Sequence, residues 1–152
     1  MSFCFFVAGI PRSLSVGTTI RFRRTPEGPL QHVQGRRHSE WAVLVGEIGR
    51  RYAPPSPLTG PVAFRATFYV PRPRATPKRV QWPTKRPDVD SLVHKLTDQW
   101  NGVWWVDDAQ IVSFAVEKRF AASRPGVQIE VQEILEGAPV GTPVAQEGRS
   151  TG

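Results

Sequence analysis

The chain has 152 residues, which is enough for one hydrophobic core and too short for two ordinary domains. Apolar residues make up 39% of the chain and charged residues 22%, a balance typical of a globular protein with some loose segments. The formal net charge is +7 and the pI about 10.5, which favours a polyanionic partner over a basic character that merely aids solubility.

The basic charge comes mostly from arginine, which supplies 16 of the 20 positive side chains. Its planar guanidinium suits phosphate better than the point charge of lysine does. Cys4 is the only cysteine, which excludes an internal disulfide and a cysteine-rich zinc site. The same scarcity favours a reducing, intracellular location.

The first element is the apolar run over residues 3–10, which is far too short to span a bilayer. It lacks the preceding basic residues of a secretory signal, and Pro11-Arg12 follows it, so we interpret it as a buried strand. Residues 11–38 carry six arginines against the single acid Glu27. We expect this stretch to be a loop.

A first helix is predicted to begin after Ser39, which suits the N-cap position. Pro54 and its neighbouring prolines end it. The residues expected on its buried face recur at helical spacing: Trp41, Leu44, Val45, Ile48 and Tyr52.

Residues 62–70 alternate between apolar and mixed positions, which predicts a strand with one buried face. The loop that follows, residues 71–87, contains no acidic side chain. We expect its cations to bind DNA phosphates, contacts that position DNA without reading its bases. These cations are Arg72, Arg74, Lys78, Arg79, Lys85 and Arg86.

A second helix is predicted from about Asp90 to Trp100, with Asn101-Gly102 offering the left-handed conformation that ends a helix. Two strands should follow, at about 111–118 and 127–134. The resulting order β-α-β-α-β-β predicts an α/β or α+β fold in which a single mixed sheet packs with two main helices. We expect one domain over residues 1–135 and a mobile tail over 136–152, which is rich in Gly, Pro, Ser and Thr.

The aspartates are clustered directly after the most basic loop. Clustered carboxylates repel one another and usually need a cation between them, and two or three carboxylates are enough for Mg²⁺. Taken singly, Asp90 could be only an N-cap and Asp107-Asp108 only the corner of a turn. Together with the basic loop, the cluster favours a metal site. Its members are Asp88, Asp90, Asp98, Asp107 and Asp108.

Two separated acidic motifs in this region resemble those of the RusA family of Holliday-junction resolvases. The family pattern is D-x-D-N-L-x-K, a D-A-L helix end, and D-D-x-Q-[IV] after a short return. The similarity covers residues 60–135 well and the first 50 in outline. The matching residues are Asp88-Val89-Asp90-Ser91-Leu92, Asp98, Asn101-Gly102, and Asp107-Asp108-Ala109-Gln110-Ile111.

The resemblance implies a RusA-like fold and a magnesium-dependent homodimer, with Mn²⁺ as an alternative metal, that nicks two opposed strands of a four-way DNA junction symmetrically. It implies no membrane partner and no small-molecule cofactor, and a bacterial or phage-encoded protein of the cytoplasm that works at the nucleoid. The family's acidic ligands match Asp88, Asp90 and Asp108, with Asp107 as an outer partner.

The sequence departs from the family pattern at two positions. Ser91 replaces the usual Asn, and His94 stands where the family has a catalytic lysine, with Lys95 one place later. On one continuous helix His94 would share a face with Asp90, four residues away. Either His94 takes the cationic role, or Lys95 does, or activity is impaired; a surface histidine without a role is the fourth interpretation.

The aromatic residues have two interpretations each. Trp82 either stacks on an unpaired base at a branch point or covers the edge of the core. Trp100, Trp104 and Trp105 are assigned to the core or a dimer interface, and the apolar succession over residues 3–6 is expected to lie partly against a partner subunit. Two rival functions remain open at this point: a nuclease acting on flaps or single strands, and a non-catalytic basic DNA-binding module.

Overall fold

The computed structural model describes residues 1–12, 15–25, 28–93 and 96–137, and for residues 15–25 and 28–38 it describes the backbone alone. Its main sheet has the strand order β1-β6-β4-β5. Strands β4 and β5 pair in parallel and the other neighbours are antiparallel, so the sheet is mixed. The strands are β1 (Ser2–Ala8), β4 (Val62–Val70), β5 (Ile111–Phe120) and β6 (Gly126–Glu133).

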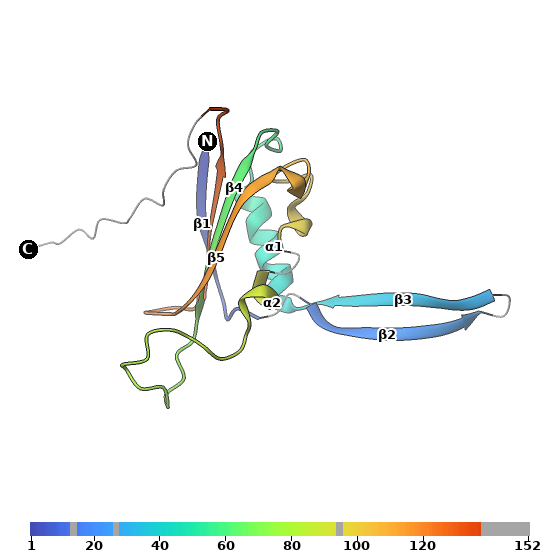
Figure 1. The fold of residues 1–152 in the computed structure, drawn as a ribbon, viewed down its shortest axis with the longest axis horizontal. Coiled ribbons are helices and arrows are strands. Elements are labelled where there is room, and N and C mark those ends of the chain that lie inside the picture. The colour runs from blue at the N-terminus through green and yellow to red at the C-terminus, as the bar shows by residue number, and fades with distance from the viewer. Residues whose placement is uncertain (13–14, 26–27, 94–95, 138–152) are drawn as a thin grey trace, which may run out of the picture.

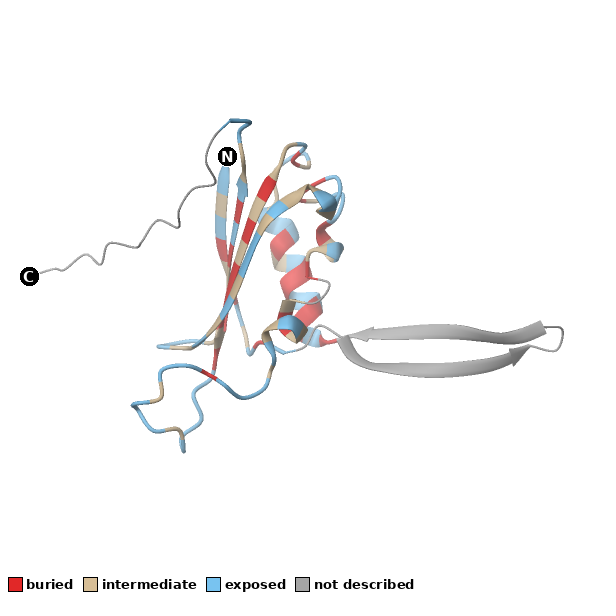
Figure 2. Ribbon diagram, in the orientation of Figure 1, coloured by how far each residue is buried: buried red, intermediate tan, exposed pale blue. Residues whose placement is uncertain are grey.

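Two α-helices, α1 (Glu40–Tyr52) and α2 (Val89–Val93), lie on one side of this sheet (Figure 1). The predicted fold class, a mixed sheet with two helices, is therefore confirmed. The buried residues gather between the sheet and α1, where the core forms (Figure 2). None of the helices described here is long and apolar enough to cross a membrane.

The four strands of the main sheet follow the predictions closely. The strand predicted over residues 62–70 has those bounds, and its alternation places Val62, Phe64 and Phe68 in the core. The parallel pairing of β4 with β5 requires a long crossover between them. That crossover, residues 71–110, carries the acid-free basic loop and all five aspartates.

Helix α1 begins as predicted, because the Ser39 hydroxyl accepts a hydrogen bond from the Ala42 N–H at 3.2 Å. Its buried face is rotated from the expected one, since Tyr52 is exposed and Gly46 and Gly49 are buried. The cause is close packing by the crossover: a Cβ at Gly49 would overlap the indole of Trp100. The glycine at position 49 therefore lets α1 approach Trp100 more closely than a larger side chain would allow.

The prediction that residues 11–38 form a loop is wrong. Strands β2 (Ser15–Thr25) and β3 (Gly28–His38) form a separate antiparallel ribbon that projects away from the main sheet (Figure 1). The signal was present in the sequence, because Val16, Ile20 and Phe22 fall at even positions among threonines and arginines. The density of arginine concealed this period-two pattern.

The single second helix predicted from Asp90 to Trp100 is also wrong. Helix α2 ends at Val93, and a separate 3-10 helix, η1 (Asp98–Trp100), follows. Between α2 and η1 the described residues form a tight turn, in which the Leu96 N–H donates to the Val93 carbonyl at 2.9 Å. Gly102 then adopts the expected left-handed conformation, with φ of 76°.

The tryptophans of the crossover resolve one open alternative. Trp100, Trp104 and Trp105 are fully buried within the chain, so they belong to the core and not to a dimer interface. The Trp104 indole N–H donates to the Gly49 carbonyl at 3.0 Å, which ties the crossover to α1. Of the tail predicted over residues 136–152, positions 138–152 lie outside the described residues.

Candidate active site and DNA-binding surface

The first acidic motif stands where the basic loop enters α2. The Asp88 carbonyl accepts a hydrogen bond from the Leu92 N–H at 3.1 Å, so Asp88 immediately precedes the helix. Asp90 lies in the first turn of α2, where a carboxylate interacts favourably with the unpaired N–H groups of the helix. Both side chains are exposed and available to a ligand.

The second acidic motif opens a short 3-10 helix, η2 (Asp108–Gln110), directly before β5. The Asp107 side chain accepts from the Ala109 N–H at 2.8 Å, and the Gln110 side chain accepts from the Asp107 N–H at 2.9 Å. Gln110 also donates to the Leu58 and Gly60 carbonyls at 2.9 and 3.0 Å. Asp107 is therefore a capping residue, and Gln110 fixes the turn to the start of β4.

Asp98, a residue outside the predicted ligand set, affects the titration of Asp108. A side-chain hydrogen bond with Asp98 is the largest cause of the raised pKa of the Asp108 carboxyl, followed by burial and by hydrogen bonding to Asp107. The sequence analysis counted Asp98 in the aspartate cluster but did not predict its influence on Asp108, because the two residues lie on separate 3-10 helices, η1 and η2.

The donor chemistry of this pair suits a divalent cation, because Mg²⁺ takes oxygen ligands and needs only one or two carboxylates beside water and phosphate. Within the part of the chain that the structure describes, no three His, Cys, Asp or Glu side chains form a group that would hold a metal ion. His94 and Lys95, the two candidates for the family's lysine role, lie outside the described residues.

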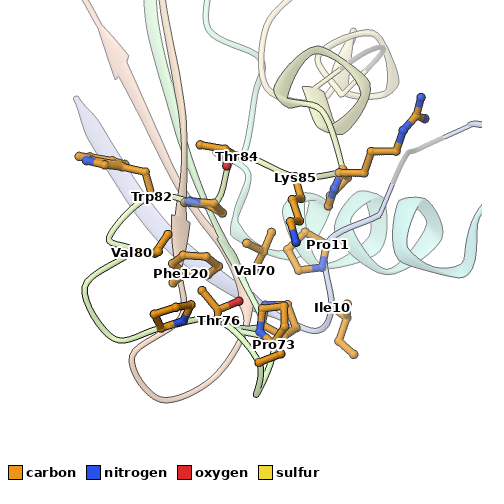
Figure 3. Close-up of a pocket in the computed structure, with 16 residues that line it drawn as sticks. Ile10, Pro11, Val70, Pro73, Thr76, Val80, Trp82, Thr84, Lys85 and Phe120 are labelled. Atoms are coloured by element: carbon orange, nitrogen blue, oxygen red, sulfur yellow. The ribbon is translucent and has the colours of Figure 1, made fainter.

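The basic loop, residues 71–87, presents all six predicted DNA-binding cations to solvent. Arg72 shapes the loop: its guanidinium lies 4.2 Å from the Phe120 ring centroid and donates to the Pro77 carbonyl at 3.2 Å. A hollow of about 460 Å³ lies beneath the loop (Figure 3). We call it the loop hollow.

A second hollow, of about 370 Å³, adjoins the first motif. Asp88 and Ser91 line it from the α2 side, and the guanidinium-bearing residues Arg12 and Arg86 also line it. Arg86 contributes to the loop hollow as well, so the two spaces share a wall. This Asp88 hollow therefore has two arginines and a predicted metal ligand in its wall.

Lys118 of β5 holds the end of the basic loop in place, a role that no sequence signal indicated. Its ammonium donates to the Lys85 and Pro87 carbonyls, at 2.8 Å each. Pro87 immediately precedes Asp88. The lysine therefore positions the backbone that carries the first acidic motif.

Replacing Lys118 by Met is expected to slow DNA cleavage about 10-fold or more while the affinity for DNA changes by less than about 3-fold. Hydrogen bonds to a charged donor contribute about 1.5–3 kcal/mol, and their loss lets Asp88 drift from its place. Single-turnover cleavage and filter binding separate the two effects. Lys118→Arg should restore part of the rate; equal rates for Lys118→Met and the intact chain would contradict the positioning role.

The arrangement defines a class: a small α+β protein whose sheet crossover carries two acidic motifs and an exposed basic loop. The family model described as endodeoxyribonuclease RusA matches residues 18–132. The chain belongs to the RusA family and is an endodeoxyribonuclease of the Holliday-junction-resolvase type. The resemblance seen in the acidic motifs is thus confirmed, and it extends back to β2.

One curated relative adds to this match. The chain is 29% identical over 100 residues to a protein of Bacillus subtilis (strain 168) described as "Uncharacterized protein YqaN". The aligned part makes up 59% of this chain and 70% of the relative. Enzymes of the RusA family generally depend on a divalent metal.

Proposed function

We propose that this protein resolves four-way DNA junctions by symmetric paired nicks that require Mg²⁺, with Mn²⁺ as an alternative metal. The observation that carries the proposal is the Asp88 hollow. It joins a family-matched carboxylate to Arg12 and Arg86, at the end of a loop without any acidic side chain. A DNA phosphate held by these arginines would lie beside the acidic centre.

Asp88, Asp90 and Asp108 would hold the metal, with Asp107 as an outer partner that also caps η2. A bound divalent ion supplies an activated water and neutralises charge on the phosphate. The other roles belong to side chains of the protein itself. Arg12 and Arg86 bind and orient the phosphate, and His94 or Lys95 supplies the cation that stabilises charge in the transition state.

We also propose that the protein is a homodimer joined through the free edge of β5. Strand β5 ends the sheet order, so one of its edges has no neighbour among the described strands. Val112 and Phe114 in the first half of this strand are 63% and 50% exposed, and exposed apolar residues on an edge strand favour pairing with another chain. An isologous pairing would present two acidic centres to the two-fold symmetric junction.

The proposed activity is tested by incubating the protein with a labelled four-way junction, a flap and a linear duplex, with Mg²⁺, Mn²⁺, Ca²⁺ or a chelator. We expect cuts in two opposed strands of the junction, only with Mg²⁺ or Mn²⁺. Preferred cutting of the flap would replace junction resolution by flap cleavage. Binding without cutting under every condition would support a non-catalytic DNA-binding module instead.

Neutralising four cations of the basic loop is expected to weaken binding to every DNA. Each lost phosphate contact should reduce the slope of log K against log salt by up to about 0.9. Fluorescence anisotropy across a salt series measures both effects, with Arg50→Gln/Arg51→Gln at the exposed end of α1 as a control. An unchanged slope would show that the loop does not contact phosphate. The substitutions are Arg72→Gln, Arg74→Gln, Lys78→Gln and Arg79→Gln.

A further inference from the structure

The loop hollow has the size and lining of a site for a flat, mostly apolar group. Its volume of about 460 Å³ falls within the range of about 300–1,000 Å³ usual for small-ligand sites. Val70 and Phe120, at the ends of β4 and β5, lie between Trp82 on one side and Pro11 and Lys85 on the other (Figure 3). The hollow therefore lies where the end of the main sheet meets the basic loop.

Trp82 stands at this hollow with half of its surface, 52%, exposed. The exposed half of its surface is available to a ligand. The Arg119 guanidinium lies over its ring, 5.0 Å from the centroid, and Arg119 is itself held by Glu117 at 3.2 Å. The indole is thus held by a neighbour that does not line the hollow, while the tryptophan itself lines it.

The charge around the hollow indicates what enters it. Lys85 and Arg86 line it, and Arg72 lies against its Phe120 wall, whereas residues 71–87 contain no acid. An apolar peptide would gain nothing from these cations. A nucleotide matches both properties, because its base is flat and its phosphate is anionic.

We propose that the loop hollow takes one unpaired base of a branched DNA, stacked on Trp82, while the adjoining phosphate lies in the Asp88 hollow. The shared wall of the two hollows, which includes Arg86, allows one nucleotide to occupy both. The inference deepens the proposed junction activity and rests on it. A base in a continuous duplex is stacked and paired, so only a branch point or an opened strand offers one at low cost.

The hollow is therefore a selectivity site for branched DNA. Aromatic stacking tolerates every base, because each base has a π face. The site would distinguish structures by the presence of a free base and not by its identity. Phosphate contacts from the rest of the basic loop would be common to all DNA forms.

The first test measures binding without metal, so that no DNA is cut. Trp82→Ala is expected to lower the affinity for a four-way junction about 5- to 100-fold and to leave the affinity for a linear duplex within about 2-fold. Trp82→Phe should restore most of the loss. Tyr52→Ala, which removes a similarly exposed aromatic outside the hollow, serves as the control. Equal losses on junction and duplex would overturn the proposal.

The second test places an abasic nucleotide at each exchange-point position of the junction in turn. At the position whose base enters the hollow, the abasic junction should bind the intact protein as weakly as Trp82→Ala binds the normal junction. Trp82→Ala should then lose nothing further on it. Additive losses at every position would overturn the proposal.

The third test replaces that base by 2-aminopurine. The fluorescence of the bound junction should be higher with Trp82→Ala than with the intact chain, because the indole quenches a base stacked on it; equal fluorescence would overturn the proposal. These readouts do not depend on cleavage. A chain that binds junctions through this base but never nicks them in pairs would disprove the proposed activity and leave the base site standing.

Discussion

Replacing Asp90 by Asn is expected to reduce junction cleavage by at least about 100-fold while the fold and the affinity for junction DNA are retained. The substitution removes a ligand charge without changing the shape of the side chain. Loss of a metal ligand costs several kcal/mol of transition-state stabilisation, and each 1.4 kcal/mol is a factor of about 10 in rate. Single-turnover cleavage in Mg²⁺, with binding measured in a chelator, separates the two quantities.

Asp88→Asn and Asp108→Asn should behave in the same way, and Glu47→Gln on the exposed side of α1 provides a charge-matched control. Asp107→Asn should differ, because it keeps an oxygen that can cap η2 and removes only an outer partner. Near wild-type cleavage by the variants of Asp88, Asp90 and Asp108 would show that the active site lies elsewhere.

Replacing Phe114 by Arg is expected to convert a dimer into a monomer and to abolish coordinated cutting of the two opposed strands. A charge on the exposed edge of β5 opposes its own copy across a two-fold axis and costs several kcal/mol to desolvate. Light scattering should report a fall from about twice 17.0 kDa to 17.0 kDa. A supercoiled plasmid bearing an extruded cruciform should then be nicked instead of linearised.

The control for this change is Val43→Arg, which places the same charge on an exposed position of α1. Phe114 also stacks on Phe64 at 5.3 Å, so thermal unfolding of both variants must show that the core is intact. An intact chain that stays at 17.0 kDa with and without junction DNA would exclude the paired-nick mechanism and favour a nuclease that makes a single cut.

Much of the fold could be predicted because its signals are local. The alternation over β4 and the Ser39 cap are read from a few neighbouring residues, and both were confirmed. The ribbon β2–β3 was missed because its arginines hide the apolar alternation. The separation of α2 from η1 was missed because Leu92, Leu96 and Trp100, all buried, recur at helical spacing in the sequence.

The same contrast between local and long-range signals applies to the candidate site. The two acidic motifs could be found from their spacing, and both lie within the range that the family model matches. Two other interactions could not be predicted from the sequence: the effect of Asp98 on Asp108 and the hydrogen bond from Lys118 to the Pro87 carbonyl. Each joins segments that come together only in the folded chain. The sequence could not decide between the core and a dimer interface for Trp100, Trp104 and Trp105 for the same reason, since burial depends on the assembled fold.

The parallel pairing of β4 with β5 makes nuclease activity dependent on complete folding. Residues 71–110 form a closed loop only after β5 has docked beside β4, and closing a loop of this length is an entropically costly step that slows folding. Until then Lys118 cannot reach the basic loop and Gln110 cannot reach the start of β4. A nascent or partly unfolded chain would therefore be expected to attract DNA through its arginines without cutting it.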